Sequence, residues 1–339
     1  MKYRYIMLAG LLVLAAGCYK DDDIRVPEDR TEFGYSVPQG TNAFDNRIVE
    51  WNGKMDKKLF ILYKFAPRDV YWNNTQWDGL LDDGAFPEGF NSAYNITQAQ
   101  EGNVDAQLRF IEDNFLSLYP ASFLKGRLPQ KILLAGTIEK HEIIYEGYPV
   151  QITEQDTYLG FDNFTIKGGD GQIAAMTGAQ KTAFAKSINR AFFSYLASKG
   201  LLEVPQDFID LAGGYQPLPL GERVFYHGFL GTILSGTQAQ KAQRDFAMYL
   251  EAALETDEFL NKVNNYPAVT NMPQYEGIFY YDPDRELQGG SPWNPVTYKG
   301  IGKDKSGKIK AKYDIVVRHM REKYGIDMKA VSATLNAIQ

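Results

Sequence analysis

The sequence predicts an α+β fold, in which strands come mainly from the first half of the chain and helices mainly from the second. Short apolar runs rich in aromatic and β-branched residues occur before residue 170, and long segments with apolar residues at helical spacing follow it. The two kinds of segment do not alternate regularly, as they would in a doubly wound sheet. We therefore expect a mixed sheet in the N-terminal half, packed on helices mainly from the C-terminal half.

Four segments of the first half predict strands. They are residues 57–65, 132–136, 141–145 and 157–166, and a glycine-rich turn at 168–171 follows the last of them. Residues 132–136 form a continuous apolar run, Ile-Leu-Leu-Ala-Gly, which is typical of a buried strand.

The first half also predicts one helix, which follows a long loop. Between residues 73 and 95 the content of Gly, Asp, Asn and Pro indicates the loop. Asn103 then stands where it can cap a helix. The apolar residues of that helix recur at helical spacing and are Val104, Leu108, Ile111, Phe115 and Leu118.

The second half is mainly helical. The predicted helices span residues 180–198, 238–261 and 310–323, and Asp327 can cap a short last one. Gly200 ends the first of these helices as a C-cap. Residues 267–300 are rich in Pro, Gly, Asn and Tyr and predict a long ordered loop. Neither an internal repeat nor a linker divides residues 36–339, so we expect one domain there.

The first 18 residues have the order of a lipoprotein signal. Lys2 and Arg4 precede an apolar run, Ile6–Leu14, which is shorter than the ~20 residues that a membrane-spanning helix needs. Ala15-Ala16-Gly17 leads into Cys18, the chain's one cysteine, as in a lipobox. We expect residues 1–17 to be removed, Cys18 to be acylated, and residues 18–35 to form a tether. The alternative is an ordinary signal peptide with a chance cysteine.

The segment Tyr19-Lys20-Asp21-Asp22-Asp23 indicates where the lipoprotein goes. A short acidic run directly after a lipidated cysteine resembles the export signal that sends Bacteroidota lipoproteins to the outer face of the outer membrane. We therefore expect a lipid-anchored protein of the outer membrane that faces the cell exterior. The alternative is a plain solvated tether.

Charge and composition exclude several classes of function. The full chain carries a net charge of −6, and the first 17 residues hold two bases and no acid, so the chain from Cys18 onward carries −8. Its basic residues are dispersed, which argues against a nucleic-acid partner. With Cys18 acylated, neither a disulfide nor a thiol nucleophile is left. Aromatic residues make up 14% of the chain, either as core or as stacking platforms for a ligand.

Known catalytic motifs are missing or incomplete. His141, His227 and His319 stand far apart, and His141-Glu142 lacks the second histidine of a zinc helix because position 145 is Tyr145. The segment 302–308 has phosphate-loop spacing but is followed by Ile309, so a lysine-rich turn fits better. Carboxylate pairs are plentiful, but their catalytic use depends on a separation that the sequence does not give.

Several segments, taken in order, resemble one family, the Bacteroidota lipoproteins described as substrate-import-associated zinc metallohydrolases. Beside the lipobox, the matching segments are Leu59–Lys64, Phe110–Tyr119, Leu128–Gly136, Gly160–Asn163, Gln180–Ser198, Gly228-Phe229, Arg244–Met248 and Tyr324–Met328. The resemblance covers nearly all of the chain after the signal. It implies a zincin-like metallopeptidase scaffold and a gene beside a TonB-dependent transporter of the starch-utilisation type.

The chain departs from this family at the zinc motif. The family's histidine-glutamate-x-x-histidine falls on Arg190, Ala191 and Ser194, and the ends of its later acidic segment fall on Arg244 and Met248. Arginine does not ligate zinc, serine is a poor ligand, and alanine cannot activate water. The resemblance therefore implies a pseudoenzyme with neither metal nor cofactor.

Two functions from different classes follow. The first is a non-catalytic accessory or substrate-binding protein of an import system for peptides or oligosaccharides, with the TonB-dependent transporter and its lipoprotein lid as partners. Trp72, Trp77 and Tyr94 are its candidate ligand or partner contacts, although the tryptophans can equally cover the core. The second is a hydrolase that uses zinc or carboxylates elsewhere. A purely structural lipoprotein is a third possibility.

Overall fold

The structure is a computed structural model that describes residues 34–73, 76–145, 147–215, 224–231, 235–263, 275–281 and 303–339. The chain divides into two units, residues 1–36 and 37–339. Cys18, the acidic run 21–23 and most of the expected loop 267–300 lie outside the described residues. In the described part, none of the helices is both long and apolar enough to span a bilayer.

A six-stranded mixed sheet is built around one long strand, β5 (Lys131–Glu142). The other strands are β1 (Phe60–Leu62), β4 (Ser92–Gln98), β6 (Gln151–Glu154), β7 (Thr157–Leu159) and β8 (Asn163–Ile166). The first part of β5 pairs in parallel with β1 and β8, and β7 pairs antiparallel with β8. The second part of β5 pairs antiparallel with β4 and β6, so one strand serves two different sheet regions.

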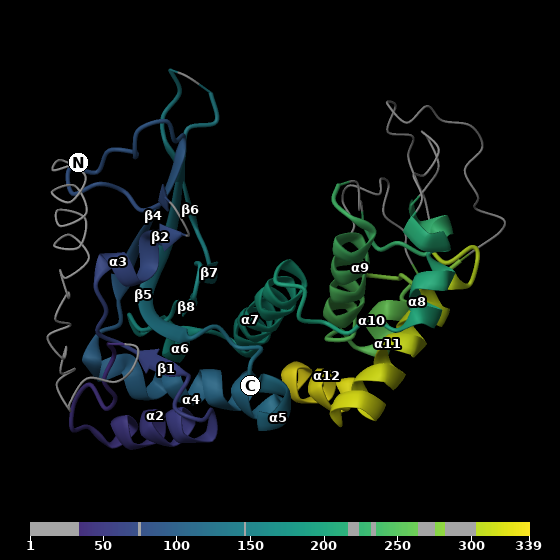
Figure 1. The fold of residues 1–339 in the computed structure, drawn as a ribbon, viewed down its shortest axis with the longest axis horizontal. Helices are drawn as coiled ribbons and strands as arrows, with labels where there is room; N and C mark the ends of the chain where they lie inside the picture. Colours follow the sequence, from purple (N-terminus) through teal and green to yellow (C-terminus); the bar gives the residue numbers. More distant parts are fainter. Residues whose placement is uncertain are drawn as a thin grey trace, which may run out of the picture. The chain divides into compact units, whose positions relative to one another are not determined.

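These two regions of β5 differ in burial. Residues 131–136 are buried, as the apolar run 132–136 predicts, whereas five of the last six residues of the strand are partly exposed. On one side, α2 (Ala43–Lys54) contacts β1 and α4 (Val104–Asn114) contacts β5. Helix α3 (Pro67–Tyr71) is joined to β8, because the side-chain amide of Asn163 donates to two α3 carbonyls at 3.1 and 3.2 Å. Figure 1 shows β4, β5 and β6 extending away from α2 and α4.

The second half of the chain supplies a group of helices. The longer ones are α7 (Gly178–Ser198), α9 (Gln238–Ala252), α11 (Lys308–Tyr324) and α12 (Met328–Asn336). The shorter ones are α6 (Gln172–Ala175), α8 (Gln206–Leu211) and α10 (Asp257–Asn261), and the short helix α5 (Ala121–Leu124) comes from the first half. Helix α7 contacts α9 and also β7, which links the helices to the sheet.

The hydrophobic core runs from the sheet into the helices. Phe115 contacts the rings of Tyr119, Phe164 and Phe192 at centroid distances of 6.0, 5.8 and 5.1 Å. These rings come from the segment after α4, from β8 and from α7. The expected α+β class with a mixed sheet is confirmed, and the helices that contact the sheet come from both halves of the chain.

The strand predictions need three corrections. The strand expected over 157–166 is two antiparallel strands, β7 and β8, with residues 160–162 between them. Residues 132–136 and 141–145 were expected as separate strands, but they belong largely to β5, because β4 pairs along the polar stretch between them. Gly136 permits this pairing, since a Cβ there would lie 2.8 Å from Thr97 Oγ1 and 2.9 Å from the Gln98 carbonyl. The expected loop 73–95 contains the end of β2 (Trp72–Asn73), all of β3 (Gln76–Trp77) and the start of β4.

The helix predictions also need two corrections. The helix expected over 238–261 is two helices, because the Thr256 hydroxyl accepts the Phe259 N–H at 3.1 Å and caps α10. Helix α4 ends at Asn114, and Asn103 stands at its N-cap position without a capping bond from its side chain. The cap at Asp327 is confirmed, since its carboxylate accepts the N–H groups of Lys329 and Ala330.

Candidate binding cavity between two helices

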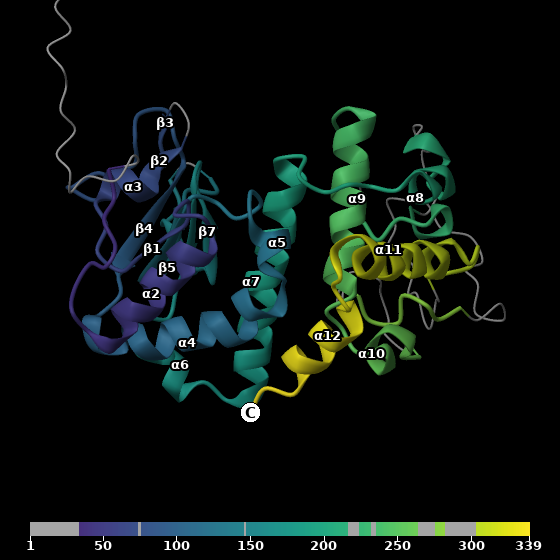
Figure 2. The same cartoon turned by 60° about the horizontal axis from the view of Figure 1, so that its bottom comes forward.

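Helices α7 and α9 lie side by side and begin in the same way (Figure 2). Each is preceded by threonine with glutamine three residues later, a capping box. Gln180 Oε1 accepts the Thr177 N–H at 2.8 Å, and Gln240 Oε1 accepts the Thr237 N–H at 2.9 Å. The local sequence therefore fixes where both helices start.

Two cations of α7 share one carboxylate next to the end of α9. Lys186 Nζ lies 2.6 Å from one oxygen of Glu255, and Arg190 Nη2 lies 2.5 Å from the other. The Glu255 side chain is almost fully buried, so this pairing compensates for its loss of hydration. Arg190, at the first degenerate motif position, therefore has a structural partner.

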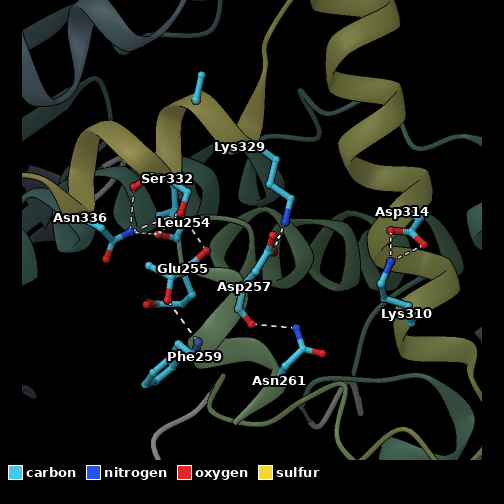
Figure 3. A network of polar contacts seen from close by, with 12 residues as sticks. Leu254, Glu255, Asp257, Phe259, Asn261, Lys310, Asp314, Lys329, Ser332 and Asn336 are labelled. Carbon is cyan, nitrogen blue, oxygen red and sulfur yellow. Dashed lines mark hydrogen bonds and ion pairs between the residues drawn. The ribbon is translucent and has the colours of Figure 1, made fainter.

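Side chains of α12 bond to the backbone at Leu254 and Glu255 (Figure 3). The Ser332 hydroxyl donates to the Glu255 carbonyl at 2.8 Å, and the Asn336 amide donates to the Leu254 carbonyl at 3.1 Å. These bonds satisfy carbonyls at the end of α9 that have no helical partner. The carboxylate shared by Lys186 and Arg190 is thus held in place by its own backbone.

A second carboxylate, Glu251, lies in the last turn of α9, four residues before Glu255. The Tyr275 hydroxyl donates to one of its oxygens at 2.7 Å, and the Ser194 hydroxyl donates to the other at 3.4 Å. Burial raises the pKa of Glu251, and the bond from Tyr275 and the charge of Arg190 oppose that rise. Burial and the neighbouring Glu251 also raise the pKa of Tyr275, so its hydroxyl keeps its proton.

An open cavity of about 580 Å³ lies between α7 and α9. Its lining includes three degenerate motif positions, Ser194, Arg244 and Met248, together with Glu251. The remaining lining residues are Ala197, Ser198, Ser235, Gly236, Gln240 and Ala247. The structure therefore brings two sequence segments that lie about fifty residues apart to one cavity. Ala191 is partly buried on α7 and does not belong to this lining.

Arg244 and Met248 are both held at the cavity by local contacts. The Arg244 guanidinium donates to the carbonyls of Ser235 and Gln240, which directs its charge across the start of α9. Met248 lies against Gly231, where an added Cβ would be 2.3 Å from the methionine methyl. Hydroxyl groups, a guanidinium, a carboxylate and a thioether together make a mixed polar and apolar lining.

Asp245, next to Arg244, points away from the cavity and into the protein. Its carboxylate pairs with Lys312 of α11 and accepts the Tyr215 hydroxyl at 2.8 Å, and neither side chain of the ion pair is exposed. Lys312 also donates to the Gly228 carbonyl at 2.8 Å. Two segments that carried the family resemblance, Gly228-Phe229 and Arg244–Met248, are therefore joined through one lysine.

The cavity lining does not fit a zinc ion. Glu251 is its one carboxylate, already bonded to Tyr275 and Ser194, and the nearby Arg244 guanidinium would repel a cation. In the described part of the chain, no three His, Cys, Asp or Glu side chains gather as a metal site would require. His141 pairs with Glu139 at 3.2 Å on β5, and His319 packs edge-on against Phe246 and Tyr324.

The predicted contact residues Trp72, Trp77 and Tyr94 lie beside the sheet and away from the cavity lining. Trp72 and Trp77 are opposite each other in the β2–β3 pair, and 54% of Trp72 is exposed. Trp77 packs against Tyr71 at 5.3 Å, and Tyr94 packs against Tyr158 at 4.7 Å. Trp72 is the most exposed of the three.

Sequence reasoning missed Lys186, Glu251, Glu255 and Tyr275. A signal for three of them was present, because Glu251 on α9 and Glu255 just after its end are four residues apart, as Lys186, Arg190 and Ser194 are on α7. Residues at this spacing share one helix face, so two matching faces could have been paired. Nothing in the sequence indicated Tyr275, which comes from a segment without regular structure.

Neither a family model nor a curated protein matches this chain. Among solved structures, the chain is similar to a protein from Bacteroides caccae ATCC 43185 described as a "putative zinc-binding metallo-peptidase", with a TM-score of 0.41 and 13% sequence identity. The similarity covers 86% of this chain and 89% of that one. At these values the similarity assigns neither a ligand nor an activity to this chain.

Proposed function

We propose that this protein is a non-catalytic, substrate-binding accessory of a nutrient import system on a zincin-like metallohydrolase scaffold. It is anchored at Cys18 on the outer face of the outer membrane. Its partners are a TonB-dependent transporter of the starch-utilisation type and the transporter's lipoprotein lid. The cargo is peptide or oligosaccharide, bound in the cavity between α7 and α9.

One observation carries the proposal. Ser194, Arg244 and Met248, three of the degenerate motif positions of the resembled family, line one open cavity, and Arg190 is paired beside it with Glu255. A cavity of this size and mixed lining suits a small polar ligand. The serine hydroxyls, Gln240 and Arg244 supply donors for carbonyl, carboxylate or sugar oxygens, and Met248 and Ala247 supply apolar contact.

The cavity is tested by filling it. The purified chain from residue 36 onward is titrated with trialanine and with maltoheptaose by calorimetry, and hydrolysis of both probes is followed by chromatography. We expect one probe to bind and neither to be cleaved. Ser194→Trp should abolish the binding, whereas Ser117→Trp, at an exposed position outside the cavity, should preserve it.

The alternative hydrolase makes the opposite prediction. Cleavage of either probe, with about one zinc per chain by elemental analysis after dialysis, would establish it and end the proposal. Binding that survives Ser194→Trp would place the ligand elsewhere. Failure of both probes to bind, with the fold intact by circular dichroism, would also count against the cavity.

The anchor and the partners need separate tests. Cys18→Ala should leave the protein unprocessed or soluble, and protease added to whole cells should digest the wild type. Antibody capture of the neighbouring transporter from solubilised outer membranes should co-purify this chain. If capture recovers the barrel and lid without it, the protein acts alone at the surface.

A further inference from the structure

Exposed apolar side chains concentrate at one end of the sheet. We call this end the arm; it consists of β4, β6, the second part of β5 and the connecting residues 143–145 and 147–150. Tyr145 and Tyr148 are 68% and 70% exposed, with their rings 5.9 Å apart. Ile144, Val150 and Ile152 are also exposed. Five large apolar side chains exposed within nine residues are unusual for a surface that faces only water.

The arm also has a free strand edge. All four residues of β6 are exposed, and within the described residues β6 pairs with β5 alone. The Gln155 N–H donates to the Ile138 carbonyl at 2.8 Å, which fixes the alternation of the antiparallel ladder. By that alternation, the N–H and C=O groups of Ile152 and Glu154 point away from β5. These backbone groups can form hydrogen bonds with an added strand.

The surroundings of the arm are acidic. Neither lysine nor arginine occurs in residues 69–108 or 141–166. The Ile143 N–H donates to the Asn91 carbonyl at 2.7 Å, which joins the arm to the loop before β4. That loop exposes Asp82, Asp83 and Glu88, for which no ion pair exists with any described residue. The nearby Lys140 and Lys167 are already paired with carboxylates.

The acidic surroundings of the arm narrow the kinds of partner that can bind to its free edge. An anionic membrane surface would be repelled, and a second copy of the chain would bring the same acidic loop. A free edge with apolar side chains on one face and carboxylates around it matches an extended segment that alternates apolar and basic residues.

We propose that the edge of β6 binds an extended basic-apolar segment of a partner protein by strand addition. Backbone groups of Ile152 and Glu154 pair with the added strand. Val150, Ile152 and the two tyrosines contact its apolar side chains, and the acidic loop attracts its basic residues. This surface is separate from the cavity, so the inference holds whether or not the cavity binds cargo.

The test uses a defined probe, the fluorescent peptide acetyl-Lys-Val-Lys-Val-Lys-Val-amide, with anisotropy as readout on the chain from residue 36 onward. We expect saturable binding that slows amide hydrogen exchange at Ile152 and Glu154. Ile152→Pro removes an outward N–H without removing a bond to β5 and should weaken binding at least tenfold. The matched Ile152→Val keeps that N–H and should bind within threefold of the wild type.

Peptide controls complete the design. The same peptide with glutamate in place of lysine, and one N-methylated at alternate residues, should not bind. Equal binding by Ile152→Pro and Ile152→Val, or exchange protection elsewhere, would overturn strand addition. So would an arm that instead drives dimerisation in light scattering, or adsorption to phosphatidylglycerol vesicles, with no binding of the basic peptide.

Discussion

The helical region around Lys312 and the arm around Tyr148 distribute polarity in opposite ways. The first buries an ion pair with no exposed side-chain surface, whereas the second exposes tyrosines to about 70%. Lys312 has a carboxylate, a carbonyl and three aromatic rings around it, with ring centroids 4.4 to 4.9 Å from its nitrogen. Apart from their contact with each other, Tyr145 and Tyr148 are left largely exposed by the described residues around them.

The difference separates structural from binding residues. A buried charge persists only where the fold supplies its partners, so an ion pair such as Lys312–Asp245 serves the fold. An exposed apolar side chain contributes little to the stability of the fold. Its surface is removed from water, which is favourable, only when a partner covers it. A buried ion pair therefore indicates a structural role, whereas a cluster of exposed apolar side chains indicates a binding surface.

The largest expected effect is at the buried ion pair. Lys312→Ala leaves the buried Asp245 without its counter-ion, which should lower the free energy of unfolding by about 3–5 kcal/mol in urea denaturation. The double variant Lys312→Met/Asp245→Leu removes both charges and should recover most of that loss. A loss under ~1 kcal/mol for Lys312→Ala would show that water reaches the pair.

The next effect lies where β5 passes from buried to exposed. The Gln107 amide donates to the carbonyls of Ala135, Ile166 and Lys167, at 2.9 to 3.0 Å, and is fully buried. Gln107→Leu leaves these carbonyls without that donor and should cost about 2 kcal/mol in the same assay. If the cost is near zero, the boundary between the two parts of the sheet does not depend on this residue.

The pH dependence of stability tests a second buried lysine of the helical region. Burial lowers the pKa of Lys303 to about 8, and Glu276 partly opposes this. Between pH 8 and the unfolded pKa of ~10.4, the unfolded chain holds a proton that the folded chain has lost, so stability should rise with pH. Relative to Lys303→Met, the wild type should gain about 1 kcal/mol per pH unit in that window. A constant difference would contradict the lowered pKa.

The smallest effect is expected in the arm. Tyr145→Ser/Tyr148→Ser should change the free energy of unfolding by less than ~0.5 kcal/mol, because these side chains are mostly in water. A loss above ~1.5 kcal/mol would mean that the tyrosines support the fold, and the contrast between the two regions would fail.

Local signals predicted the elements that depend on local chemistry. Helix α7 and the Asp327 cap follow from apolar spacing and from a side chain that bonds two residues ahead. The continuity of β5 did not follow from its sequence, because its polar residues 139–142 are held in the strand by β4 and β6. Strand β4 is distant in sequence, and β6 is too exposed to show an apolar pattern. The cavity needed the pairing of α7 with α9, which no single segment contains.

The double use of β5 also has a mechanical consequence. Twelve extended residues span roughly 40 Å, so the arm and the buried end of the sheet are two ends of one nearly inextensible strand. A pull along this strand from the arm would load its hydrogen bonds to β1 and β8 together, in shear. A pull across it would peel β6 away bond by bond. The protein should therefore resist a force that a ligand at the arm applies along β5, and give way more easily to a force applied across it.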